Sequence, residues 1–324
     1  MTWPCRLPAS PSWRSAPRTP ARASASAADL APLTQRRLLF VTGKGGTGKS
    51  TVACAVALRA AREGKRTLLV EMDAKGSVAA ALGMAPAGYE PAPAGNNLWV
   101  MSMDTENSLR EYLRIHLRIP VVTRLGPLAA TFDFVADAAP GVREVLAVGK
   151  VCWEVREGHY DLVVVDAEAS GHVVAQISSP RTIKSLVPRG PLRDQTSWML
   201  DILDDPERTG VVVVTTAEEL PVTETAALVA RLRAETRTDV ACIVANALEP
   251  GVGAGAAALA ADQWFSARCP EHARSTTAAA SRAAAQEECV ADLMSAVPGV
   301  PVVRVPLHGA SGAELAALVG GGLP

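Results

Sequence analysis

The chain has 324 residues, of which 48% are apolar and 20% are charged, and its formal net charge is -1. A charge this close to zero argues against a nucleic-acid or anionic-membrane surface, and no apolar run reaches the roughly 20 residues that span a bilayer. The six cysteines form no Cys-x-x-Cys pair, which argues against a disulfide scaffold or a zinc knuckle and favours reduced thiols in a cytoplasmic protein.

The N-terminal segment differs in composition from the rest of the chain. Residues 1–36 mix Pro, Ser, Ala and Arg without periodicity. Such a segment buries too little apolar surface to offset the entropy of ordering. We therefore expect a disordered tail over 1–36, or a start codon assigned too early, and one large α/β domain over 37–324.

Regular patterning begins at Arg37. Short apolar runs predict strands at 38–42, 67–71, 98–101, 162–165, 211–215, 240–245 and 302–305. Helical spacing predicts helices at 50–63, 108–117, 142–157, 223–235 and 273–296, and 250–262 is typical of a loop passing into a weak helix. The alternation predicts a doubly wound, mostly parallel sheet with helices on both faces, whose ligands bind at the carboxyl ends of the strands.

A complete phosphate-binding loop follows the first predicted strand, with the sequence Gly43-Lys44-Gly45-Gly46-Thr47-Gly48-Lys49-Ser50. The glycines let successive N–H groups point at phosphate oxygens, and the helix that follows adds the positive end of its dipole. In this pattern Lys49 neutralises the β- and γ-phosphates, and the Ser50 hydroxyl coordinates Mg²⁺. Lys44 is either a solvated lysine or a second cation that reaches phosphate from a facing subunit.

Polar residues also follow other predicted strands. Asp166 ends an apolar strand, where a carboxylate either holds Mg²⁺, commonly through water, or caps the next turn. Asp73 ends the neighbouring strand and is either close to the γ-phosphate or a turn-forming residue. Asn246 follows the strand at 240–245, where its amide both donates and accepts hydrogen bonds, or forms a turn.

The loop extended to Thr51 resembles the deviant Walker A loop of the SIMIBI class of P-loop ATPases, which includes ArsA, the GET-pathway ATPases, MinD, ParA and the nitrogenase iron protein. Three segments narrow the resemblance to the ArsA/GET-type family. Residues 71–77 resemble its switch I, with Ala74 in place of a proline, and residues 161–172 resemble its switch II. Residues 215–225 resemble a family stretch that opens a helix after a core strand.

The resemblance implies an ATP hydrolase that uses ATP and Mg²⁺ in a P-loop fold. It implies that Asp73 orients or deprotonates the attacking water, with Lys44 and Lys49 acting on the phosphates, and that Gly171 brings switch II to the γ-phosphate as a hinge. It also implies that Asn246 reads the adenine edge. His172 matches the family's histidine, and a hydrogen bond within the switch explains it as well as a chemical role does.

Three functions remain open at this level. The leading one is an ArsA/GET-like ATPase, homodimeric or paired with a paralogue, whose switches act on a client protein or a membrane partner. The second is a regulatory subunit with weak catalysis, and the third is a MinD/ParA-like positioning ATPase, which the uncharged ending 316–324 disfavours. An apolar stripe over 109–134 is either core or a client groove, and the cysteine spacing predicts no three-thiolate metalloid site.

Overall fold

The structure is a computed structural model that describes residues 33–73, 75–104, 107–108, 111, 142–186, 189, 191–309, 314 and 316. Its strands are β1 (Leu38–Gly43), β2 (Thr67–Glu71), β3 (Ala92–Gly95), β4 (Leu98–Ser102), β5 (Leu162–Asp166), β6 (Thr209–Thr216), β7 (Asp239–Leu248) and β8 (Val302–Pro306). Its helices are η3 (Leu33–Gln35), α1 (Lys49–Arg62), α2 (Ser77–Leu82), α5 (Val142–Glu157), α6 (Ser170–Leu186), α7 (Pro191–Leu203), α8 (Glu219–Glu235), α9 (Ala254–Ala261), α10 (Gln263–Arg268) and α11 (Pro270–Ala296).

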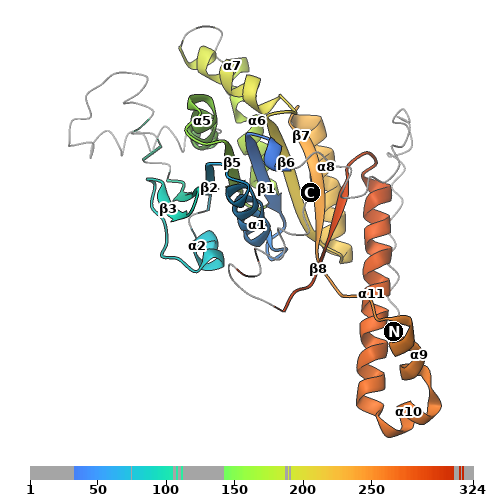
Figure 1. The fold of residues 1–324 in the computed structure, drawn as a ribbon. Helices are drawn as coiled ribbons and strands as arrows, with labels where there is room; N and C mark the ends of the chain where they lie inside the picture. Colours follow the sequence, from blue (N-terminus) through green and yellow to red (C-terminus); the bar gives the residue numbers. More distant parts are fainter. Residues whose placement is uncertain are drawn as a thin grey trace.

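The strands form one 8-stranded sheet in the order β3-β4-β2-β5-β1-β6-β7-β8 (Figure 1). Neighbours are parallel throughout except for the antiparallel pair β3 and β4. β1 lies between β5 and β6. Because these strands are parallel, the residues that follow β1, β2, β5, β6 and β7 all lie at the edge of the sheet where the carboxyl ends of the strands meet. This arrangement confirms the predicted doubly wound, mostly parallel sheet.

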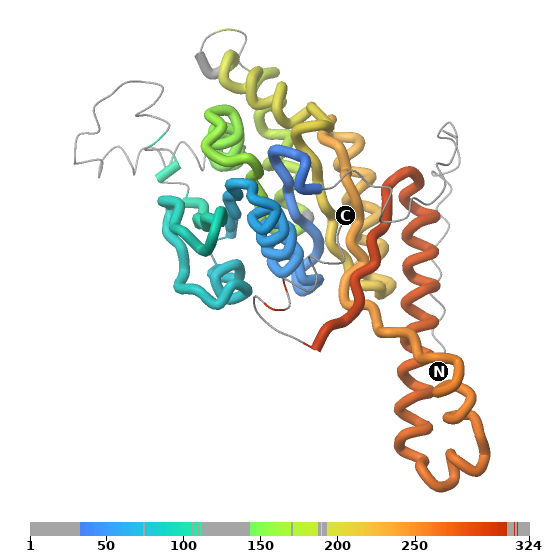
Figure 2. Tube along the Cα trace, in the orientation of Figure 1, coloured from blue at the N-terminus to red at the C-terminus, as the bar shows by residue number. Residues whose placement is uncertain are grey.

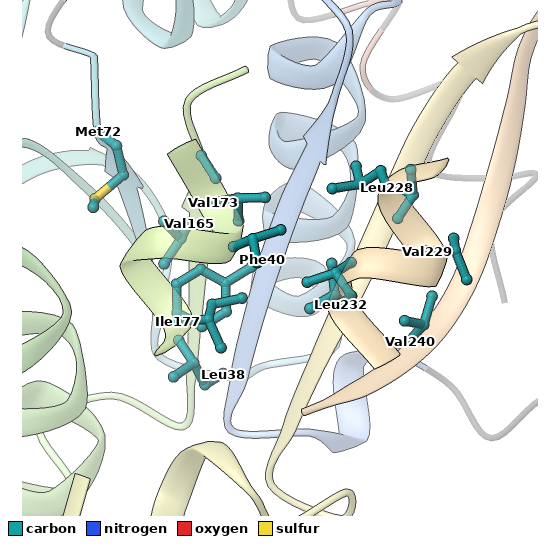
Figure 3. Close-up of a cluster of buried hydrophobic side chains, with 14 of the residues drawn as sticks. Leu38, Phe40, Met72, Val165, Val173, Ile177, Leu228, Val229, Leu232 and Val240 are labelled. Carbon is teal, nitrogen blue, oxygen red and sulfur yellow. The ribbon is translucent and has the colours of Figure 1, made fainter. Parts of the chain in front are cut away.

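Successive residues of the central strands face two separate cores, because side chains alternate across a sheet. Leu38 and Phe40 belong to the cluster covered by α5, α6, α7, α8 and α11. Leu39 and Val41 belong to the opposite cluster, which α1, α2 and η3 cover. Figure 3 shows Phe40 close to Ile177 of α6 in the first of these clusters. The buried, apolar strands therefore fix β1 at the centre, with its carboxyl end leading into the glycine-rich loop.

The structure differs from the sequence prediction in several connections. α2, α6 and α7 were not predicted as helices, and the short edge strand β3 was not predicted at all. α6 contains Pro180 in its interior, and proline is a strong signal against helix. β3 carries the sequence APAG, which has little strand propensity and pairs only at the sheet edge.

α11 joins the sheet domain to a small group of helices that extends away from it (Figure 2). Only its last turns carry buried residues that pack on the sheet domain, among them Cys289, Val290 and Leu293. α9 and α10 pack against the earlier part of α11. Within the described ranges, no helix is both long and apolar enough to cross a membrane.

Some expectations fall wholly or largely outside the described residues. These are the tail over 1–32, nearly all of the helix predicted at 108–117, the apolar stripe over 109–134 and most of the ending 316–324. The last residues of the expected tail are described and are packed. Leu33 and Thr34 are buried, and the Arg36 guanidinium donates to the Thr209 carbonyl at 2.6 Å.

Candidate functional site

The glycine-rich loop connects the end of β1 at Gly43 to the start of α1 at Lys49. Gly43 and Gly48 have φ angles of 149° and 91°, which side chains disfavour. A Cβ on Gly43 would lie 2.0 Å from the Val214 carbonyl oxygen, and one on Gly48 would lie 2.3 Å from Nδ2 of Asn246. Gly43 is therefore required by its close contact with the backbone of β6, while Gly48 is favoured mainly by its positive φ, since its neighbour is the end of the Asn246 side chain.

Lys49 folds back across this loop. Its ammonium donates to the Lys44 carbonyl at 3.1 Å, and the Thr47 hydroxyl donates to the same oxygen at 2.9 Å. Burial lowers the pKa of Lys49, with Asp166 acting in the opposite direction. The N-cap of α1 is Gly48, and in the described part of the chain no side chain caps this helix start. An ammonium and uncapped helical N–H groups at one point are the donors that bind phosphate.

Ser50 and Asp166 meet beside the loop. The Ser50 hydroxyl donates to Oδ2 of Asp166 at 2.6 Å. Asp166 is only 6% exposed, and its Oδ1 is buried without a hydrogen-bond partner among the described residues. Burial raises the pKa of Asp166 to about 6, because the Ser50 bond and the Lys49 charge offset desolvation only in part. A hydroxyl and a carboxylate oxygen without a partner fit Mg²⁺, which prefers oxygen ligands.

Glu71 supports the next strand end, and the sequence analysis gave it no role. Its Oε1 accepts from the N–H groups of Ser77 at 2.6 Å and Val78 at 3.3 Å, and Ser102 donates to its Oε2 at 3.3 Å. Glu71 thus closes the turn from β2 into α2 that contains Asp73. A charged residue at the end of an apolar strand was the available sequence signal.

Asp73 lies in that turn and forms an ion pair with Lys75. The Asp73 bond is the main cause that raises the pKa of Lys75, and Glu168 acts in the same direction. Asp73 and Lys75 are both exposed, at 46% and 71% of their side chains. The ion pair is therefore exposed to solvent and weak, so a bound molecule can separate the two side chains.

The segment after β5 brings Glu168 to the end of β1. The Thr42 hydroxyl donates to the Glu168 carbonyl at 3.1 Å, and Nδ1 of His172 lies 3.5 Å from Oε2 of Glu168. The His172 side chain is 68% exposed. Gly171 lies in the first turn of α6 and does not have a positive φ, so its backbone in this state is ordinary helix.

Two residues from α8 and β7 complete the surroundings of the loop. Nζ of Lys44 lies 2.8 Å from Oε1 of Glu224 on α8. Nδ2 of Asn246 donates to the Thr47 carbonyl at 2.9 Å, and Asn246 is buried. Thr51 follows Ser50 in the first turn of α1. The fold thus assembles most of the predicted residues at one sheet edge, with Asn246 in contact with the loop backbone.

Cys54 lies one turn after Ser50 in α1, and Cys242 lies in β7. Cys54 and Cys242 are buried, and burial raises the pKa of each thiol to about 12. Among the described residues, no group of three or more His, Cys, Asp or Glu side chains is arranged to hold a metal ion. An ion at Ser50 and Asp166 would therefore draw its other ligands from water and a bound nucleotide.

The sequence of the chain is similar to those of several proteins that are named ATPases. ATPase BagA of Mycobacterium tuberculosis is 31% identical over 221 residues, which cover 65% of this chain and 64% of that protein. ATPase get3 of Schizosaccharomyces japonicus is 29% identical over 182 residues, covering 53% of this chain and 55% of that protein. The arsenical pump-driving ATPase of Escherichia coli is 25% identical over 209 residues, covering 58% and 35%.

The chain thus aligns with less than two thirds of the length of each of these relatives. Residues 36–192 match the sequence profile of the anion-transporting ATPases. That range contains the loop, Asp73 and Asp166, and it ends before α8 and β7. Residues 36–192 of this chain are therefore similar to the ATPase domain of the anion-transporting, ArsA-type ATPases.

Proposed function

We propose that this chain binds ATP with Mg²⁺ at the glycine-rich loop and hydrolyses it. The observation that carries the proposal is the contact between Ser50 and Asp166, 2.6 Å apart beside the Lys49 ammonium. These three groups meet at the uncapped start of α1, next to a loop that folds as a phosphate cradle. Two relatives of the chain are named ATPases.

In the bound state, the loop N–H groups and Lys49 hold the phosphates, and Lys49 leaves the Lys44 carbonyl to do so. Ser50 and Asp166 would hold the ion, which would supply positive charge to neutralise the charge that develops on the phosphoryl oxygens. We include Thr51 and Asn246 in the nucleotide site. Asn246 reaches the adenine only if its amide leaves the Thr47 carbonyl or uses its own oxygen.

Hydrolysis requires a group that orients water. We assign this role to Asp73, since it lies in the turn that Glu71 closes and its charge acts on both Lys49 and Asp166. An Asp73 carboxylate held by Lys75 has one acceptor occupied. The other Asp73 oxygen can still accept a hydrogen bond from water, and separation of Lys75 frees the first oxygen as well and makes the carboxylate a stronger acceptor.

Beyond the reaction, we propose that residues 71–77 and 161–172 change position with the nucleotide state, with Gly171 as the hinge. A cytoplasmic homodimer, or a heterodimer with a paralogue, that acts on a client protein or a membrane partner belongs to this proposal. So does the division into an N-terminal tail and one ATPase domain, with the boundary moved from residue 37 to Leu33, where the packed residues begin.

The second candidate is a nucleotide-binding regulatory subunit with weak catalysis. The ion pair between Asp73 and Lys75 favours it, because Lys75 occupies an oxygen of the carboxylate that would otherwise face the attacking water. Phosphate release from the purified chain, measured with Mg²⁺ and with EDTA, distinguishes the two. Turnover that requires Mg²⁺ and falls in Asp73→Asn supports the ATPase, while tight ATP binding with no turnover supports the regulatory subunit.

A further inference from the structure

Lys44 is held by α8 on its own subunit. Its ammonium lies 2.8 Å from Glu224, which follows it by 180 residues in the chain. The backbone carbonyl of Lys44 accepts hydrogen bonds from the Lys49 ammonium and from the Thr47 hydroxyl. Lys44 therefore connects the loop to α8 through its side chain and to the start of α1 through its backbone.

The position of Glu224 follows from the topology. β6 is the parallel neighbour of β1, and α8 begins soon after β6 ends. The start of α8 consequently lies at the same sheet edge as the loop. Glu224 shares a face of α8 with Leu220, one turn earlier, whose side chain is 58% exposed. This face is accessible to another molecule, and the ion pair is only partly buried, since the Lys44 and Glu224 side chains are 33% and 38% exposed.

An ammonium that is already paired with a carboxylate binds a second anion less readily, because the existing ion pair has to break first. We propose that Glu224 is a positioning residue that holds the Lys44 ammonium on its own subunit. Lys44 then has to break this ion pair before it reaches a phosphate, either of its own nucleotide or of a nucleotide on a second copy of the chain. The movement of Lys44 to a phosphate, called the phosphate step below, depends on the proposed function. The ion pair by which Glu224 holds Lys44, called the hold below, does not.

The first test measures the hold without nucleotide. The rate at which an amine-acylating reagent modifies Lys44 is followed by peptide mass spectrometry, with Lys184 on α6 as the internal reference. In Glu224→Gln we expect this rate to rise about two- to fivefold, the range that an exposed ion pair allows. Glu219→Gln, which removes the same charge from the first turn of α8, is expected to leave it unchanged. Glu224→Asp is expected to lie closer to the wild type.

The second test measures the phosphate step. Calorimetry with Mg-ATP reports an effect on the subunit's own nucleotide, and sedimentation at saturating ATP reports an effect on a second copy. Glu224→Gln is expected to lower either the Kd for ATP or the protein concentration at which ATP induces self-association. In a Lys44→Met background the same change is expected to have no effect, since there is no ammonium to release.

The outcomes separate the inference from the proposed function. Equal Lys44 modification rates in the wild type, Glu224→Gln and Glu219→Gln overturn the hold by Glu224. An effect on binding or association that persists without Lys44 overturns the phosphate step. A raised modification rate in a chain that takes up no ATP leaves the hold in place and rejects the proposed function.

Discussion

The Ser50 hydroxyl donates a 2.6 Å hydrogen bond to Oδ2 of Asp166, joining the first turn of α1 to the last residue of β5. The two residues are 116 positions apart and are brought together because β1 and β5 are parallel neighbours. The second oxygen of Asp166 is buried without a protein partner among the described residues. The contact therefore presents two oxygen ligands beside the Lys49 ammonium, and the account of nucleotide binding depends on it.

The glycines of the loop provide a stability prediction with a matched control. Gly43→Ala places a Cβ 2.0 Å from the Val214 carbonyl at a φ of 149°, so we expect the free energy of unfolding to fall by about 2–4 kcal/mol. A Cβ on Gly45 meets no atom within 4 Å, so Gly45→Ala is expected to change it by at most about 0.5 kcal/mol. Denaturant titration measures both, and equal effects would contradict the loop geometry.

Asp166 predicts a pH dependence of stability in the absence of Mg²⁺ and nucleotide. Its pKa is raised from 3.8 to about 6 in the folded protein, so the folded state binds more protons between these values and stability decreases as pH rises through that window. Above about pH 6 the ionised form costs on the order of 3 kcal/mol. At pH 7.5 the free energy of unfolding of Asp166→Asn is expected to be higher than that of the wild type by up to this amount. Near pH 4 the two free energies are expected to be equal. A pH-independent difference would refute the assignment.

Asp73 and Lys75 predict opposite changes in hydrolysis. Asp73→Asn removes the proposed water-orienting carboxylate, so single-turnover hydrolysis is expected to slow about 100-fold with ATP affinity unchanged. Lys75→Ala releases that carboxylate, and the rate is expected to rise about two- to fivefold. Rapid-quench measurements test both changes. A Lys75→Ala increase that survives in the double variant with Asp73→Asn would show that Lys75 does not act through Asp73.

Asn246 predicts a combined effect on stability and on choice of base. Asn246→Ala removes the hydrogen bond to the Thr47 carbonyl and leaves that oxygen without its donor, so the free energy of unfolding is expected to fall by about 1–3 kcal/mol. If Asn246 also reads adenine, the ratio of GTP to ATP dissociation constants moves toward one in the same variant. An unchanged ratio with reduced stability would restrict Asn246 to supporting the loop.

The sequence predicted the elements whose signals are local. The apolar run before Gly43, the glycine spacing and the helix after Lys49 lie within a few residues of one another, and the fold confirms this strand, loop and helix. α6 was missed because Pro180 and several short polar residues weaken its helical pattern. The sheet order also followed the expected class, because parallel strands and crossover helices leave few alternatives.

The supporting contacts of the site could not be predicted. The contact between Lys44 and Glu224 joins residues 180 positions apart, and the contact between Asn246 and Thr47 joins residues 199 positions apart. Such pairs depend on which strands become neighbours and on how far each strand extends, and residue spacing carries no information on either. Glu71 was visible as a charge at a strand end, but its role emerged only from the N–H groups that it binds.

The central claim is tested most directly by calorimetric titration of ATP into the full chain with Mg²⁺ present. We expect saturable binding that weakens when EDTA removes the ion, and a Kd about 10- to 100-fold higher in Lys49→Ala, which loses a charge-assisted contact to phosphate. Lys184→Ala is the matched control and is expected to bind as the wild type does. Absence of ATP binding by the folded wild-type chain, or equal affinity in Lys49→Ala, would contradict the account.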